Sequence, residues 1–242
     1  MIEVSGNNNL EDILNAEDVL SMLDSLLREP APFWDGFYRD KEKDIPFFVE
    51  VPDENLISYF EDYDINPETA LEIGCGNGRN AIYIARKGCQ VEAIDISSEA
   101  IGWAHQNADR SNVDITFMNG SVFDIVNEKC KYDFIYDAGC LHHIAPHRRI
   151  NYIELIKRSL NPGGYFGLTC FAHGQGGGAE ISDWEVYRLR SLKGGQAFTE
   201  GKLRKLFEGA FDVIELRMMK EIKQPATAFG ESFLWAVLFR KA

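Results

Sequence analysis

The sequence has no hydrophobic run that approaches the roughly 20 residues needed to span a bilayer. Its first nine residues are polar and lack the basic start and apolar middle of a secretory signal. The cysteines are odd in number and form no CxxC pair; they are Cys75, Cys89, Cys130, Cys140 and Cys170. This usage is typical of reduced thiols rather than of a disulfide framework. We therefore predict a cytoplasmic protein that does not bind membranes.

Basic residues are scarce in the first part of the chain. Residues 1–72 hold 19 acidic side chains against four basic ones, whereas the rest of the chain holds 19 against 21. The net charge of the whole chain is −13. Proteins that bind nucleic acid normally present a basic face, because they must neutralise phosphates. The charge distribution therefore disfavours nucleic acid and other polyanionic substrates, although the near-neutral remainder does not exclude them.

From about residue 69 the pattern alternates between buried strands and helices. Apolar runs typical of strands lie at 69–73, 90–95, 113–118, 132–137 and 164–171, and helical stretches lie at 79–87, 98–109 and 146–159. This alternation predicts right-handed βαβ units and an α/β fold with a parallel sheet covered on both faces. Two final strands near 211–219 and 231–240 are expected to pair antiparallel.

The rest of the chain is predicted to form a cover and an insertion. Residues 10–28 have the apolar spacing of a helix, which two prolines would end, and an aromatic, poorly periodic stretch follows. We expect residues 1–66 to be an N-terminal helical cover and residues 67–242 to be the main domain. The glycine-rich segment 172–197 has the length and composition of a mobile active-site loop.

The most informative segment is LEIGCGNGRN at 71–80, where a buried strand runs into three alternate glycines and then into a helix. Gly74, Gly76 and Gly78 can expose backbone N–H groups at the start of that helix, where a ligand carboxylate gains from the donors and from the helix dipole. Asp95 ends the next predicted strand, and its two acceptor oxygens suit a ribose diol. Together these features predict a mononucleoside pocket at the sheet edge.

These motifs resemble those of the class I S-adenosylmethionine-dependent methyltransferases. The resemblance covers about residues 68–171 and includes the YDFIYD segment at 132–137 and the LNPGG segment at 160–164. The DAGCLHHI segment at 137–144 resembles the small-molecule branch that includes the thiopurine and tellurite-resistance methyltransferases. The resemblance implies S-adenosyl-L-methionine as the cofactor. It also implies a Rossmann-like, doubly wound seven-stranded sheet of order 3-2-1-4-5-7-6 with strand 7 antiparallel.

The resemblance further implies which residues bind the cofactor. Glu72 would support the glycine loop and reach the methionine amine through water, and Asp95 would hold the ribose. The full set that it implies is Glu72, Gly74, Cys75, Gly76, Asn80, Asp95, Ile96, Ser121, Val122, Asp137 and Gly139. Ser121 departs from the family pattern, because many members have Asp there. A serine can still bond to the adenine amine or to a ring nitrogen.

The expected methyl acceptor is a small molecule, and its sulfur, nitrogen or oxygen nucleophile is left open by the sequence. An amine or hydroxyl acceptor must lose a proton to a base during the transfer. The candidate bases are His142, His143 and Asp137. A thiolate needs no base. Of the cover, Trp34 and Tyr38 are expected to contact the substrate.

Two further substrate contacts are expected, from His142 and from Trp184 in the insertion. A metal is not expected, because Cys140, His142, His143 and His147 match no tetrahedral spacing.

Two alternatives to a methyltransferase stay open. Gly76, Gly78 and Ala81 satisfy the dinucleotide fingerprint, so a nicotinamide-dependent oxidoreductase is one of them. The Tyr83–Lys87 pair, however, lies in the helix directly after the loop and cannot reach a nicotinamide. The other alternative is a non-catalytic module that binds S-adenosylmethionine or S-adenosylhomocysteine. The oligomeric state is not fixed by the sequence, which is compatible with a homodimer.

Overall fold

A seven-stranded sheet of order β3-β2-β1-β4-β5-β7-β6 forms the centre of the molecule. The computed structural model describes residues 12–63, 65–125, 132–223 and 226–241. The strands are β1 (Thr69–Ile73), β2 (Gln90–Asp95), β3 (Thr116–Asn119), β4 (Tyr132–Ala138), β5 (Leu160–Phe171), β6 (Asp212–Met218) and β7 (Leu234–Arg240). Strand β7 is antiparallel to both of its neighbours, and the other pairs are parallel. The predicted α/β fold, its strand order and its antiparallel strand 7 are confirmed.

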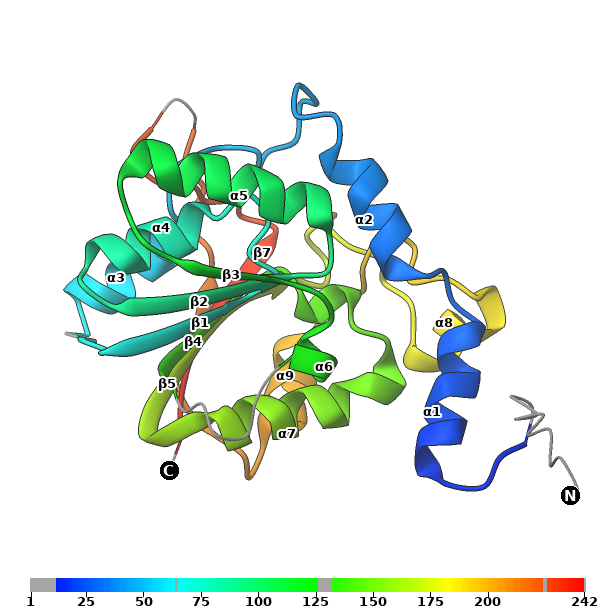
Figure 1. Ribbon diagram of the computed structural model, residues 1–242. Coiled ribbons are helices and arrows are strands. Elements are labelled where there is room, and N and C mark those ends of the chain that lie inside the picture. Colours follow the sequence, from blue (N-terminus) through cyan, green and yellow to red (C-terminus); the bar gives the residue numbers. More distant parts are fainter. Residues whose placement is uncertain (1–11, 64, 126–131, 224–225, 242) are drawn as a thin grey trace, which may run out of the picture.

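Helices cover both faces of this sheet (Figure 1). One face carries α3 (Glu54–Glu61), α4 (Arg79–Arg86) and α5 (Ser98–Ser111), and the other carries α6 (Val122–Ile125), α7 (Arg149–Ser159) and α9 (Glu200–Phe207). Consecutive residues of β1 belong to different cores, since Ala70 packs with the first group of helices and Leu71 with the second. Burial on both faces explains why the central strands read as continuous apolar runs.

The parallel register brings three chain segments to one edge of the sheet. Ile73 pairs with Ile94 of β2 on one side and with Asp137 of β4 on the other. The glycine loop after β1, Asp95 at the end of β2 and the turn after β4 therefore meet at the carboxyl ends of the strands. In open α/β sheets, ligands bind in the crevice at this edge.

Before α3, which lies where a short helix near 53–62 is expected, the chain forms two helices where the sequence predicted one. Helix α1 (Ala16–Ser25) begins with a capping box in which Asn15 and Asp18 exchange side-chain-to-backbone hydrogen bonds. The start of the predicted helix, like Cys130, lies outside the described residues. Helix α2 (Pro30–Tyr38) holds the aromatic stretch that has no clear period in the sequence. Pro30 fits its first turn, because the backbone N–H that proline lacks would have no partner within the helix there. Its Tyr38 packs on Trp103 and Ala100 of α5.

The predicted insertion contains helix α8 (Asp183–Leu189) and is tied at its base. Isolated bridges join Ala172 to Phe198 and Ala179 to Gln196, so its two ends lie side by side. Its mobility, and the division of the chain into cover and main domain, stay predictions. Among the described residues, no helix is both long enough and apolar enough to cross a membrane.

Candidate active site

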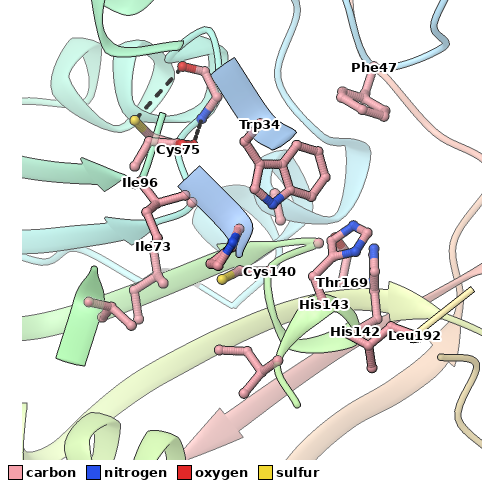
Figure 2. A pocket seen from close by; sticks show the side chains of 18 of the residues that line it. Trp34, Phe47, Ile73, Cys75, Ile96, Cys140, His142, His143, Thr169 and Leu192 are labelled. Atoms are coloured by element: carbon pink, nitrogen blue, oxygen red, sulfur yellow. Dashed lines mark hydrogen bonds between the residues drawn. The ribbon is translucent and has the colours of Figure 1, made fainter. Parts of the chain in front are cut away.

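A cavity of about 640 Å³ opens at the carboxyl ends of the central strands. Its floor is the glycine loop, and its other walls come from α2, from the short helix η1 (Leu141–His143) and from the chain after α8. Figure 2 shows Ile73, Cys75 and Ile96 on one side, and Trp34 with the two histidines on the other. Segments distant in sequence therefore enclose one space large enough for a nucleoside and a second small molecule.

The glycine loop follows β1 with Gly74, Gly76 and Gly78 all at positive φ, at +68°, +55° and +79°. At Gly76 a side chain is excluded on two grounds. The backbone is left-handed, and a Cβ built there would lie 2.8 Å from the Tyr38 hydroxyl oxygen. The loop is anchored from behind, because the N–H groups of Gly74 and Cys75 both donate to the Ile94 carbonyl. The result is a fixed backbone cradle with no side chain at its closest point.

Asp95 ends β2 beneath this loop and is 7% exposed. Its Oδ2 accepts the Gly76 N–H at 2.9 Å, and its Oδ1 accepts the Ser97 N–H at 2.9 Å. Burial raises the pKa of Asp95 to about 6, although both backbone donors oppose the shift. A carboxylate has about four acceptor positions, so two remain for a ligand diol.

Glu72 connects the glycine loop to the helix that follows it. Its Oε2 accepts the Ala81 N–H at 2.8 Å in the first turn of α4. Burial raises the pKa of Glu72 to about 8, and the opposing cation is Arg79. Arg79 also lines the cavity and pairs with buried Asp53 at 2.5 Å. Asn80 accepts the Asp53 backbone N–H, so this cavity-lining residue also holds the chain before α3.

Asp137 lies below the cavity rather than in its wall. Its carboxylate accepts the N–H groups of Cys140 and Leu141 and the hydroxyl of Tyr152. Burial raises the pKa of Asp137 to about 6, opposed first by the Tyr152 bond. The side chain thus fixes the turn that presents Gly139 and Cys140 to the cavity. The structure does not bring this predicted base to a position facing a substrate.

His142 and His143 do line the cavity, in different environments. His142 Nδ1 accepts the Phe171 N–H at 3.3 Å, and its ring stacks on the Phe171 ring at 3.8 Å between centroids. His143 meets Trp34 edge to face at 4.7 Å. Burial lowers the pKa of His142 far below its ordinary value, and burial with nearby Arg28 lowers that of His143 to about 4. Both imidazoles are neutral at pH 7 and are weak bases.

The remaining predicted residues divide into two groups. The following all line the cavity: Trp34, Tyr38, Gly74, Cys75, Ile96, Ser121, Val122 and Gly139. Trp184 does not, because it projects from α8 with 76% of its surface exposed.

Part of the wall was not predicted from the sequence, including Arg28, Arg79, Phe229 and Phe233. The segment 190–194 also lines the cavity, and it lies within the predicted active-site loop 172–197. Arg79 could have been noticed, because a cation in the first turn of a helix is unfavourable without an anionic partner.

Part of this chain is similar to known methyltransferases. Residues 70–164 match the family model described as a methyltransferase domain. An uncharacterized methyltransferase of Synechocystis is 30% identical over 50% of this chain and 53% of its own length. The probable S-adenosyl-L-methionine-dependent methyltransferase TehB of Haemophilus influenzae is 29% identical over 42% of this chain and 35% of its own length. The matched part of the chain therefore spans about half of the first relative and about a third of the second.

A solved structure resembles nearly the whole chain. It is the Burkholderia thailandensis 1,6-didemethyltoxoflavin-N1-methyltransferase with bound 1,6-didemethyltoxoflavin and S-adenosylhomocysteine. It superposes with a TM-score of 0.62 and 20% identity, covering 96% of this chain and 92% of its own. At this level of identity the likeness is one of fold.

Proposed function

We propose that this chain is an S-adenosylmethionine-dependent methyltransferase, which transfers the cofactor's methyl group to a small-molecule acceptor. The match of residues 70–164 to a methyltransferase domain supports the proposal. The observation that carries the proposal is the pairing of the glycine cradle with Asp95 at the edge of a large cavity. The cofactor fits these residues, since the backbone at Gly76 has no room for a side chain and Asp95 has unused acceptor positions.

In this proposal Asp95 accepts the two ribose hydroxyls, and Ile96 and Val122 pack against the adenine. Ser121 bonds to the adenine edge. The methionine portion lies along the glycine loop, with Glu72 below it. When bound, the cofactor supplies a sulfonium whose methyl carbon is the electrophile.

The chain's own contribution to the chemistry is orientation and exclusion of water. Trp34 and Tyr38 close the cavity from α2, and we propose that residues 1–66 act as the cover and 172–197 as the movable wall. Orientation of reactants alone is worth about 7–11 kcal/mol of a reaction barrier. His143 faces the cavity as a weak base, so it is better suited to accept a hydrogen bond from the acceptor than to remove a proton from an amine or alcohol.

The experiment that tests the proposal is calorimetric titration with S-adenosylhomocysteine and, separately, with NADH. We expect binding of the first and none of the second. The Asp95→Ala variant removes charge-assisted bonds worth about 1.5–3 kcal/mol, so its affinity for S-adenosylhomocysteine should fall roughly 10- to 150-fold.

Asp114→Ala is the matched control, because Asp114 is exposed and outside the cavity. Its affinity should equal that of the wild type. Unchanged binding by the Asp95 variant would reject the assignment of Asp95. Binding of NADH in place of S-adenosylhomocysteine would favour the oxidoreductase. Binding without methyl transfer to any thiol, amine or hydroxyl acceptor would favour the non-catalytic module.

A further inference from the structure

The two ends of the cavity differ in charge. The acidic side chains that line it are Glu72 and Asp95, and both lie at the glycine-loop end. The cationic side chains that line it are Arg28, Arg79, Arg148, Arg190 and Lys193. This excess of cations stands in a chain whose net charge is −13, so it is a local feature of the cavity rather than a reflection of composition.

Two of these cations are already paired within the protein. Arg79 binds Asp53 at 2.5 Å, and Arg148 binds Glu17 and Asp24 of α1 at 2.8 and 2.5 Å. The other three, Arg28, Arg190 and Lys193, have no carboxylate partner among the residues that the structure describes. Arg28 instead lies over the Phe33 ring, 3.2 Å from its centroid.

These three cations approach the cavity from two segments that meet at the histidine pair. Arg28 precedes α2 and is close enough to contribute to the lowered pKa of His143. Arg190 and Lys193 lie in the turn after α8. A Cβ built on the adjoining Gly195 would be 3.1 Å from His143 Cε1 and 2.9 Å from His142 Cδ2. The unpaired cations therefore border the histidine end of the cavity.

The walls at this end are apolar. Trp34 lies beside His143 (Figure 2) and meets it edge to face, Phe171 stacks on His142, and Phe47 and Leu192 also line the cavity. We propose that the methyl acceptor is an anion: an apolar or aromatic body with an oxyanion such as a carboxylate, which Arg28, Arg190 and Lys193 bind. This inference deepens the proposed function and rests on it. A small, singly charged acceptor differs from the polyanions that the acidic first part of the chain disfavours.

An anionic acceptor also agrees with the weakness of the available bases. Neutral imidazoles with lowered pKa values take up a proton poorly. A cationic surround lowers the pKa of an acidic nucleophile on the same acceptor, such as a thiol or phenol, so that the atom that takes the methyl group arrives ionised and requires no base.

A pair of fluorescent probes with and without an oxyanion tests the proposal. The protein, saturated with S-adenosylhomocysteine, is titrated with an anilinonaphthalene sulfonate and with anilinonaphthalene itself. We expect the wild type to prefer the sulfonate, because only the sulfonate meets the cations. The triple variant R28Q/R190Q/K193Q should bind the sulfonate about tenfold more weakly and the neutral probe unchanged.

Arg188→Gln is the matched control, because Arg188 is an exposed cation in the last turn of α8, near Arg190 in the chain but outside the cavity. The charge-conserving variant R28K/R190K should bind the sulfonate about as well as the wild type. All three cations are exposed, so the variants are expected to fold, and R190Q/K193Q alone provides a second test.

The proposal is overturned if the wild type binds both probes equally, or if R188Q loses as much sulfonate binding as the triple variant. Calorimetry with S-adenosylhomocysteine distinguishes a failure of the anion site from a failure of the proposed function. If that ligand does not bind but the cation-dependent preference for the sulfonate persists, the proposed function fails and the anion site stands.

Discussion

Gly76 meets two requirements at one position, a left-handed backbone and contact with the Tyr38 hydroxyl. Gly88 meets only the first, since its φ is +94° and a Cβ there would contact nothing within 4 Å. We expect Gly88→Ala to cost about 1–2 kcal/mol of folding free energy through backbone strain alone. Gly76→Ala should cost more and should also weaken S-adenosylhomocysteine binding at least about tenfold, because Tyr38 must move.

Chemical denaturation and calorimetry on both variants make this comparison. Equal effects of the two substitutions on ligand affinity would show that the Gly76–Tyr38 contact has no part in the site.

Because the pKa of Asp95 is raised, we expect ligand binding to depend on pH. Its pKa of about 6 means that the carboxylate is protonated below that pH and loses acceptor capacity. Affinity for S-adenosylhomocysteine should therefore fall as the pH decreases below about 6, by up to about tenfold per unit. Glu72, with a pKa of about 8, stays protonated through this range and contributes little.

Asp137 has a similar pKa, but it lies below the cavity, so Asp95→Asn separates the two carboxyls. The variant should bind weakly at pH 7 and show a flat profile. A wild-type slope that persists in the variant would assign the titration to another group.

Single residues differ in how far the sequence reveals their positions. The glycines and Asp95 were predictable because a strand, a tight turn and a strand end encode their placement locally. The sequence did not reveal that the Asp137 carboxylate accepts the Tyr152 hydroxyl, because only the packing of α7 brings Tyr152 to it. Trp184 was expected in the cavity but faces outward because α8 buries Val186 instead.

Helix α1 is attached to the rest of the molecule mainly by charge. None of its residues is buried, and Arg148 with His147 binds Asp24 and Glu17. The carboxylates of these pairs are 45–62% exposed, and pairs open to solvent contribute about 0.2–1 kcal/mol each, so this attachment is weak. Asp24→Asn should accelerate proteolysis between α1 and α2 by roughly two- to fivefold and leave the thermal midpoint nearly unchanged.

The control is Glu200→Gln, which breaks an exposed pair with Arg204 on α9 and should not alter cleavage near α1. High salt should reproduce the effect of D24N in the wild type. If D24N leaves the cleavage rate unchanged, contacts other than these ion pairs hold the helix.

Helices and strands with a strong hydrophobic period could be predicted from the sequence. Helices defined by tertiary contacts were harder to predict. The parallel strands, α4, α5 and α7 carry their pattern in the sequence and lie within a few residues of their expected bounds. Helix α2 does not, since its aromatic residues contact both the cavity and α5, which leaves no clear apolar stripe.

For the whole molecule, the cover and the sheet depend on each other. The Val49 carbonyl accepts from the Asn77 side chain and the Val51 carbonyl accepts from Arg79, so the part of the cover between α2 and α3 supports the glycine loop. We predict that deletion of residues 1–50 weakens S-adenosylhomocysteine binding and abolishes turnover. Deletion of residues 1–27 alone should retain ligand binding, because α2 stays.

Calorimetry and formation of S-adenosylhomocysteine from S-adenosylmethionine measure these effects. Full activity of the protein that lacks residues 1–50 would reject the role of the cover. The sequence could not show that Arg28 and Arg190 line the same cavity, because only the assembled fold brings these two segments together.

The most direct measurement is a crystal structure of the protein grown with S-adenosylhomocysteine. The account predicts that both ribose hydroxyls lie within hydrogen-bonding distance of Asp95, and that the sulfur points toward Trp34 and His143. Density for the ligand at any other place, or a ribose without contact to Asp95, would contradict it.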